Sequence, residues 1–153
     1  MVEFDYEKYF GFKSRLELNQ FLYENASLEV FGQADITYDG IMTRFNTFLM
    51  DIEDDSDHKV ILVGREANVS IPSTYFFLSK TICKIKDIKF YHDHENLWDD
   101  VDVLISANPD VLAARPDNKV SIKVETTYNK ESEANVTIKK LETINESRKI
   151  KNQ

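Results

Sequence analysis

Cysteine is almost absent from this chain of 153 residues, because Cys83 is the only one. An internal disulfide is therefore excluded, and we expect the thiol to pack on the apolar side of a helix. Glycine and proline are also scarce, with four and three residues, which leaves little room for long flexible linkers. Internal repeats and low-complexity tracts are missing as well. Together with the length, these absences predict a single domain over residues 1–153.

Long apolar runs and a basic excess are missing too. No stretch approaches the roughly eighteen apolar residues of a membrane span, so no membrane partner is expected. Residues 1–10 carry early acids and lack the apolar centre of a signal peptide, and we expect a cytoplasmic protein. The formal net charge is −8. Direct binding to nucleic acid needs a basic face and is not expected, although an acidic surface could meet a basic protein.

The clearest feature that is present is the stretch from Lys59 to Ile85. It begins with KVILVG, a continuous apolar run that is typical of a strand buried on both faces. The polar turn REANVSIP follows, and STYFFLSKTICKI then has the composition of a helix with an aromatic face. A strand, a turn and a helix in this order predict half of a parallel β-α-β unit.

Hydrophobic spacing predicts further elements on both sides of this unit. Ser14 and Glu17 form a capping box before an apolar stripe at helical spacing. The expected helices cover residues 15–24, 39–52, 109–114 and 136–150, and the expected strands cover 27–32, 87–93, 101–108 and 119–128.

The last of these strands alternates apolar and polar side chains, which suits an edge strand with one wet face. The alternation of helices and strands predicts an α/β fold: a mostly parallel sheet of about five strands with helices on both faces, a Rossmann-like three-layer sandwich. Within the single domain, we assign residues 1–26 to an aromatic N-terminal segment and helix. Residues 27–128 form the core, and residues 129–153 a closing helix and tail.

Ligands of open parallel sheets bind at the carboxyl ends of the strands. The polar residues expected at these ends form the candidate ligand-binding site: Gln33, Asp35, Arg65, Glu66, Ser70, Ser106 and Asn108. The guanidinium of Arg65 suits a phosphate or a carboxylate, but it could equally pair with a local acid. The Ser70 hydroxyl could bind an anion at a helix N-terminus, or it could cap that helix.

Chemistry beyond binding has little support in the sequence. The chain has no nucleophile elbow, P-loop or GxGxxG motif, so no catalytic residue is assigned and no cofactor is expected. His92 and His94 could share one strand face and hold a metal, but a third ligand is not apparent, and no metal site is predicted. The acidic stretch 53–57 has no metal-loop spacing and is interpreted as a solvated connector.

The order of these elements over residues 28–128 resembles the core of the haloacid-dehalogenase-type phosphatases, and in particular their small nucleotidases. KVILVGRE and DVLISANPDVLAARPDNKVSIKV carry this resemblance. It implies a haloacid-dehalogenase-like scaffold that takes phosphorylated compounds. The leading strand of that family ends in Asp-x-Asp, whereas VFGQAD places Gly32 and Ala34 at those two positions. The resemblance therefore implies binding without the carboxylates that phosphoryl transfer needs.

The stretches EVFGQADIT, SIPSTYFFLSKT and ANPDVL also resemble small accessory proteins of large tailed bacteriophages. This implies residence in the host cytoplasm and the modulation of a host defence. The predicted function is non-enzymatic: binding of a nucleotide or another phosphorylated small molecule, with possible sequestration of a host signal. The first alternative is a divergent magnesium-dependent phosphatase or nucleotidase that uses Asp35. The second is an acidic inhibitor that binds a host protein.

Overall fold

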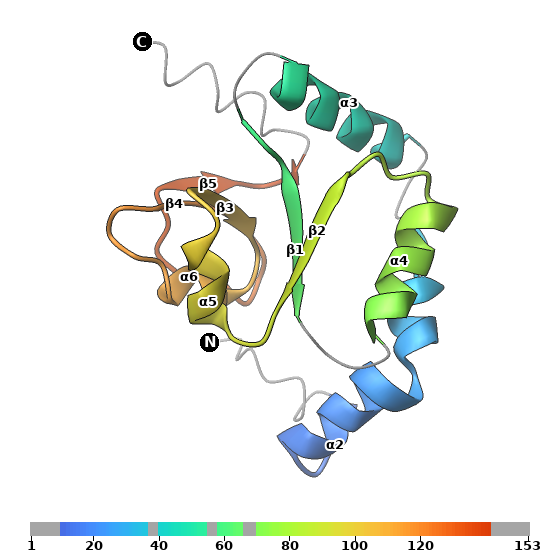
Figure 1. Cartoon of the computed structure of the whole chain (residues 1–153). Coiled ribbons are helices and arrows are strands. Elements are labelled where there is room, and N and C mark those ends of the chain that lie inside the picture. The colour runs from blue at the N-terminus through green and yellow to red at the C-terminus, as the bar shows by residue number, and fades with distance from the viewer. Residues whose placement is uncertain (1–9, 37–39, 55–57, 66–69, 142–153) are drawn as a thin grey trace. The chain divides into compact units, whose positions relative to one another are not determined.

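The computed structural model describes residues 10–36, 40–54, 58–65 and 70–141 (Figure 1). The chain separates into two compact units. Of the described residues, those from 10 to 92 belong to one unit and those from 93 to 141 belong to the other. The expectation of a single domain stays a prediction.

The first unit begins with the helix that the capping box predicted. Helix α2 covers Arg15–Gln20, and the Ser14 Oγ accepts a hydrogen bond from the Glu17 backbone N at 3.2 Å. The Glu17 carboxylate accepts in turn from the backbone N of Lys13 at 2.7 Å. The helix continues as the π-helical segment η1, Phe21–Asn25. The expected helix over residues 15–24 is thus confirmed.

The strand expected over residues 27–32 is wrong. These residues continue the helical path as a second π-helical segment, η2, which covers Leu28–Gly32. The rings of Tyr23 and Phe31 stack at 5.5 Å, which joins η2 to η1. A short apolar run is compatible with either a strand or a buried helix, and packing decides between them. Here η2 packs against helix α4, Ser70–Lys80.

The β-α-β unit predicted around residue 70 is confirmed. Strand β1 covers Ile61–Arg65, helix α4 follows, and strand β2 covers Asp87–Tyr91. The two strands pair in parallel over their whole length (Figure 1). The rings of Tyr75 and Phe90 meet at 5.9 Å and join α4 to β2. Ile61, Leu62 and Val63 of β1 are half-buried, not fully buried as the apolar run suggested.

Helix α3, Ile41–Asp54, precedes β1 and confirms the helix expected over residues 39–52. Its Leu49 is buried, and the rings of Phe45 and Phe48 lie 6.4 Å apart on the same apolar face. The acidic stretch expected as a connector over 53–57 contributes its first two residues to this helix, and residues 55–57 lie outside the described part of the chain.

The second unit contains a three-stranded parallel sheet in the order β3–β4–β5. Its elements are α5 (His94–Asp99), β3 (Val103–Ser106), α6 (Pro109–Ala113), β4 (Val120–Val124) and β5 (Val136–Ile138). The helix expected from residue 136 is wrong at its start, because Val136, Thr137 and Ile138 are β-branched and pair with β4. Residues 142–150 of that expected helix lie outside the described part of the chain.

The edge position expected for β4 is also wrong, since β4 is the middle strand. Its polar side chains are the buried ones: Ser121 is 0% exposed and Lys123 is 5% exposed. The Lys123 ammonium donates to the backbone O of Lys130 at 3.1 Å and of Ser132 at 2.7 Å. The backbone N of Ser121 donates to the Asn135 Oδ1 at 2.9 Å. The connection to β5 thus supplies hydrogen-bond partners for the polar groups that are buried on this face.

Among the described residues, most of the buried apolar side chains belong to the second unit. Trp98 of α5 is 1% exposed, and its indole N donates to the backbone O of Val111 at 3.0 Å. This bond satisfies the one polar atom of the ring while the rest of the ring fills the core. Leu104 of β3 and Leu112 of α6 are buried as well.

The expected α/β class with parallel pairing is therefore confirmed. The described strands form two hydrogen-bonded sheets of two and three strands in place of one sheet of about five.

Candidate functional site

The carboxyl ends of β1 and β2 form the first place where predicted site residues lie. Arg65 is the last residue of β1 and is in register with Tyr91, the last residue of β2. Ser70 opens α4 and is 4% exposed. Glu66 lies outside the described part of the chain. Residues 66–69, which connect β1 to α4, lie outside the described part of the chain.

Tyr91 was not among the predicted site residues. Its position opposite Arg65 follows from the parallel register of two strands of equal length, Ile61–Arg65 and Asp87–Tyr91. The signal that could have revealed it is the end of the alternating stretch DIKFY at Tyr91. The strand predicted over residues 87–93 ends two residues too late.

Gln33 and Asp35 lie on the exposed segment that follows η2. The Lys80 ammonium donates to the backbone O of Ala34 at 2.9 Å, so this segment lies by the last turn of α4. Ser70, at the other end of α4, is separated from Lys80 by about 15 Å of helix. The Asp35 Oδ1 accepts from the backbone N of Ile36 at 2.8 Å. Gly32, which precedes Gln33, closely approaches the Ser73 O in the first turn of α4, so the segment runs from near that turn toward Lys80.

Ser106 and Asn108 lie at the carboxyl end of β3, in the second unit. The Ser106 Oγ accepts from the backbone N of Asn108 at 3.1 Å, and the Asn108 Oδ1 accepts from the backbone N of Asp110 at 2.9 Å. The amide of Asn108 is thus the N-cap of α6. Both side chains organise the turn between β3 and α6, and their expected role in ligand binding stays a prediction.

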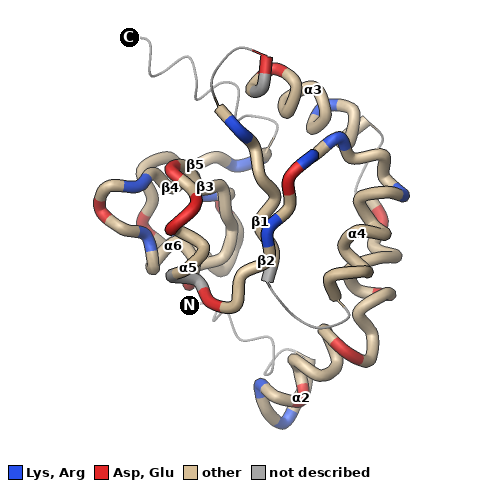
Figure 2. The backbone as a smooth tube through the Cα atoms, in the orientation of Figure 1, with Lys and Arg blue, Asp and Glu red and all other residues tan. Residues whose placement is uncertain are grey.

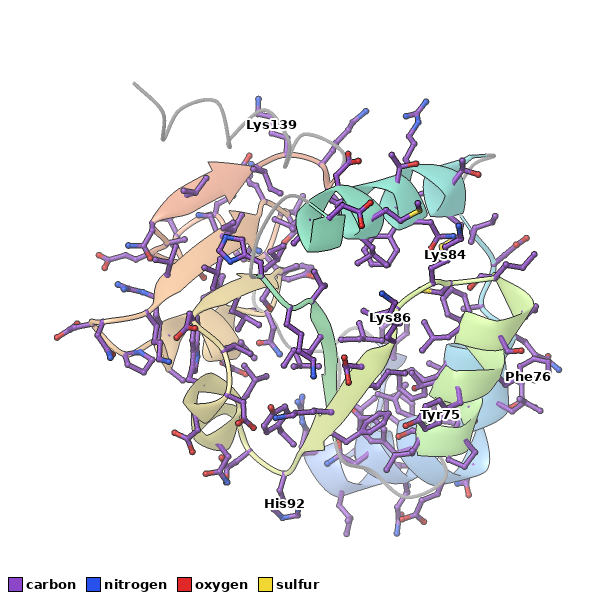
Figure 3. The ribbon with its side chains drawn as sticks, turned by 45° about the horizontal axis from the view of Figure 1, so that its top comes forward. Tyr75, Phe76, Lys84, Lys86, His92 and Lys139 are labelled. Carbon is purple, nitrogen blue, oxygen red and sulfur yellow. The ribbon has the colours of Figure 1, made fainter. Side chains whose placement is uncertain are left out.

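The histidines do not share a strand face, because β2 ends at Tyr91. His92 is exposed and points away from the ribbon (Figure 3), and His94 is the first residue of α5. Asp93 caps this helix, with its Oδ1 accepting from the backbone N of Asn96 at 2.9 Å. Among residues 10–36, 40–54, 58–65 and 70–141, no three side chains of His, Cys, Asp or Glu lie close enough to hold a metal ion.

Comparison of the chain with protein families, with curated proteins and with solved structures gave no match. Both resemblances noted in the sequence therefore stay predictions. The stretch 27–32, which the phosphatase resemblance equated with the nucleophile strand, is helical. Within the described residues, no helix has both the length and the apolar composition that crossing a membrane requires.

One arrangement of predicted site residues remains. It consists of the paired ends of β1 and β2, an arginine at one of those ends, and the first turn of a helix with 11 residues. Guanidinium groups and the backbone N–H groups of a first helical turn are the donors that bind phosphate in proteins.

Proposed function

We propose that the chain binds a phosphorylated small molecule or nucleotide, without turning it over, at the carboxyl ends of β1 and β2. The observation that supports this most is the parallel register that ends in Arg65 and Tyr91, followed by the first turn of α4. Phosphate would meet the guanidinium of Arg65 and the backbone N–H groups at the start of α4. The aromatic ring of Tyr91 could contact a base or sugar.

Binding is proposed instead of phosphoryl transfer because of where Asp35 lies. The alternative function needs Asp35 as a nucleophile beside the bound phosphate. Asp35 is on the segment near the last turn of α4, and its Oδ1 is hydrogen-bonded to the neighbouring backbone N. The proposed site therefore contains donors that hold a phosphate but does not include this carboxylate.

As a wider proposal, the chain would act as a phage accessory protein on a haloacid-dehalogenase-like three-layer scaffold, and it would sequester a host signal by binding it. The support is the set of sequence stretches named above and the β-α-β unit around α4. A protein that sequesters a signal must bind it but need not convert it. A site made of hydrogen-bond donors agrees with this role.

The experiment is isothermal titration calorimetry of the full chain against a panel of nucleotides and sugar phosphates. We expect at least one phosphorylated compound to bind and its unphosphorylated form not to bind. Arg65→Ala should weaken binding roughly tenfold or more, and Arg65→Lys should restore only part of it, because lysine lacks the bidentate fork. The control is Arg44→Ala, which changes an exposed arginine on α3 and should leave the affinity within a factor of about two.

An absence of binding by every compound at millimolar concentration would contradict the proposal. An affinity that Arg65→Ala leaves unchanged, in a variant with the wild-type thermal midpoint, would contradict the assigned site. Phosphate release that is lost in Asp35→Asn would favour the phosphatase alternative.

A further inference from the structure

Ile82 has a backbone conformation that β-branched residues rarely adopt. It follows the last turn of α4 with φ +56°, in the left-handed region, and 76% of the residue is exposed. Glycine is the usual residue at this position of a helix end, because a Cβ is strained there. Ile82 thus combines a strained backbone with an exposed apolar side chain, and neither feature helps the chain to fold.

The surrounding hydrogen bonds fix this conformation. The backbone N of Ile82 donates to the Ser79 O at 3.1 Å, and the backbone N of Cys83 donates to the Leu78 O at 2.9 Å. Asn46 of α3 adds two more bonds: its Nδ2 donates to the Ile82 O at 2.9 Å, and its Oδ1 accepts from the Lys84 N at 2.9 Å. The backbone that carries the exposed side chain is therefore held in one conformation. Cys83, expected on the helix, lies beyond its end and is half-buried.

Lysines and a second apolar side chain surround Ile82. Residues 82–86 alternate, with Ile82, Lys84 and Lys86 exposed and the two residues between them half-buried. Three exposed side chains thus follow one another within five residues of the chain. The Lys84 ammonium lies 3.7 Å from the Sδ of Met50 on α3, and Met50 is 48% exposed. We call these four residues, Ile82, Lys84, Lys86 and Met50, the Ile82 surface.

The Ile82 surface is positively charged in a chain whose net charge is −8. Lysines follow the end of α4 into β2, as Figure 2 shows along the tube and Figure 3 shows for Lys84 and Lys86. A helix C-terminus attracts cations within its last turn, which accounts for Lys80 but not for lysines farther along the chain. Among the described residues, the Lys84 ammonium contacts the Met50 thioether, which is a neutral and weak acceptor.

We propose that the Ile82 surface docks an acidic segment of a partner protein, with an apolar side chain of that segment packed on Ile82 and Met50. Carboxylates of the segment would pair with Lys84 and Lys86 and would steer the encounter. The fixed backbone at residue 82 presents the isoleucine in its bound position, so little entropy is lost on binding. A nucleic acid would use the lysines but would gain nothing from the isoleucine. An anionic membrane surface could bury the isoleucine but would gain nothing from its fixed backbone.

This surface is distinct from the phosphate site proposed above. It precedes β2, at the amino end of that strand, whereas Tyr91 is at the carboxyl end. Variants of the Ile82 surface should therefore leave nucleotide binding unchanged, and failure of one proposal can be told from failure of the other.

The test selects a displayed library of short random peptides against the immobilised full chain. We expect the enriched peptides to combine Asp or Glu with Leu, Ile or Phe. Binding measured by fluorescence polarisation should be roughly tenfold weaker in Ile82→Gly, which removes the apolar anchor. The double variant Lys84→Glu and Lys86→Glu should weaken peptide binding by at least the same factor. The matched control is Lys139→Glu with Lys140→Glu, which makes the same change of charge in the second unit and should change the affinity by a factor of about two or less.

Ile82→Gly separates a docking role from a structural one. Glycine adopts the left-handed conformation without strain, so the thermal midpoint should stay at or above that of the wild type while the affinity falls. Enriched peptides without acidic residues, no enrichment at all, or equal binding to Ile82→Gly and to the wild type would each overturn the proposal. So would binding of an oligonucleotide or of phosphatidylserine vesicles that the double lysine variant loses and Ile82→Gly keeps, because charge alone would then account for the surface.

Discussion

Asn129 ties together the ends of two strands with a single side chain. Its Oδ1 accepts from the backbone N of Thr126 at 2.8 Å, and its Nδ2 donates to the backbone O of Ala107 at 2.8 Å and of Val124 at 2.9 Å. The residue is 1% exposed. Ala107 follows β3 and Val124 ends β4, so the amide joins the carboxyl ends of these neighbouring strands. Nothing in the local sequence NKESEAN distinguishes this asparagine from a solvated loop residue.

Asn129→Ala should lower the free energy of unfolding by about 3 kcal/mol, because two buried carbonyls lose their donor and a backbone N–H loses its acceptor. Urea denaturation followed by circular dichroism measures this change. Asn118→Ala, at an exposed asparagine in the turn before β4, is the control and should change stability by less than about 0.5 kcal/mol. Equal effects of the two substitutions would show that the buried amide bonds contribute no net stability.

At the scale of elements, the contact between η2 and α4 replaces the strand that residues 27–32 were expected to form. Gly32 lies at this contact and is buried. A Cβ at residue 32 would lie 2.7 Å from the Leu28 Cδ1 and 3.3 Å from the Phe76 Cδ1. It would also lie 3.3 Å from the Ser73 O, a backbone atom of α4 that cannot rotate away. The hydroxyls of Ser27 and Ser73 are 3.1 Å apart in the same contact. Glycine thus permits the close approach of the two elements.

Gly32→Ala should therefore destabilise the protein by about 1–3 kcal/mol, since the added methyl group forces η2 away from α4. Thermal unfolding measures the loss. Ser79→Ala, on the exposed side of α4, serves as the control and should be nearly neutral. A neutral or stabilising effect of Gly32→Ala would mean that Leu28 and Phe76 move aside without cost, and that the close approach is not what fixes η2.

At the scale of the whole molecule, the two compact units allow a direct test of the expected single domain. The only tryptophan, Trp98, is buried in the second unit. The two longest described helices, α3 with 14 residues and α4 with 11, belong to the first unit. Fluorescence of Trp98 therefore reports mainly on one unit, and helical circular dichroism mainly on the other.

If the chain is one cooperative domain, both signals should change with the same midpoint in guanidinium chloride. We expect this coincidence, because a chain of 153 residues has the usual length of a single domain. Two separated midpoints would contradict it and would identify the units as independently folding domains. The Trp98→Phe variant, in which the fluorescence change should vanish while the circular dichroism transition remains, controls for the origin of the signal.

The amino-acid sequence by itself determined the local elements whose residue patterns are compatible with only one type of secondary structure. The capping box at Ser14, the apolar run of β1 and the helix after it were all predicted correctly, because capping, period and turn chemistry act between near neighbours. The β-α-β connection followed from their order. These elements place Arg65, Tyr91 and the start of α4, which form the candidate phosphate site.

The features that depend on contacts between remote segments were decided only by the tertiary structure. Residues 27–32 became helical because they pack on α4, and β4 became a middle strand because β5 pairs with its second edge. The position of Asp35 near Lys80 was likewise set by a contact between segments 46 residues apart. Such contacts depend on free energies shared between remote parts of the chain, which no local pattern of residues contains.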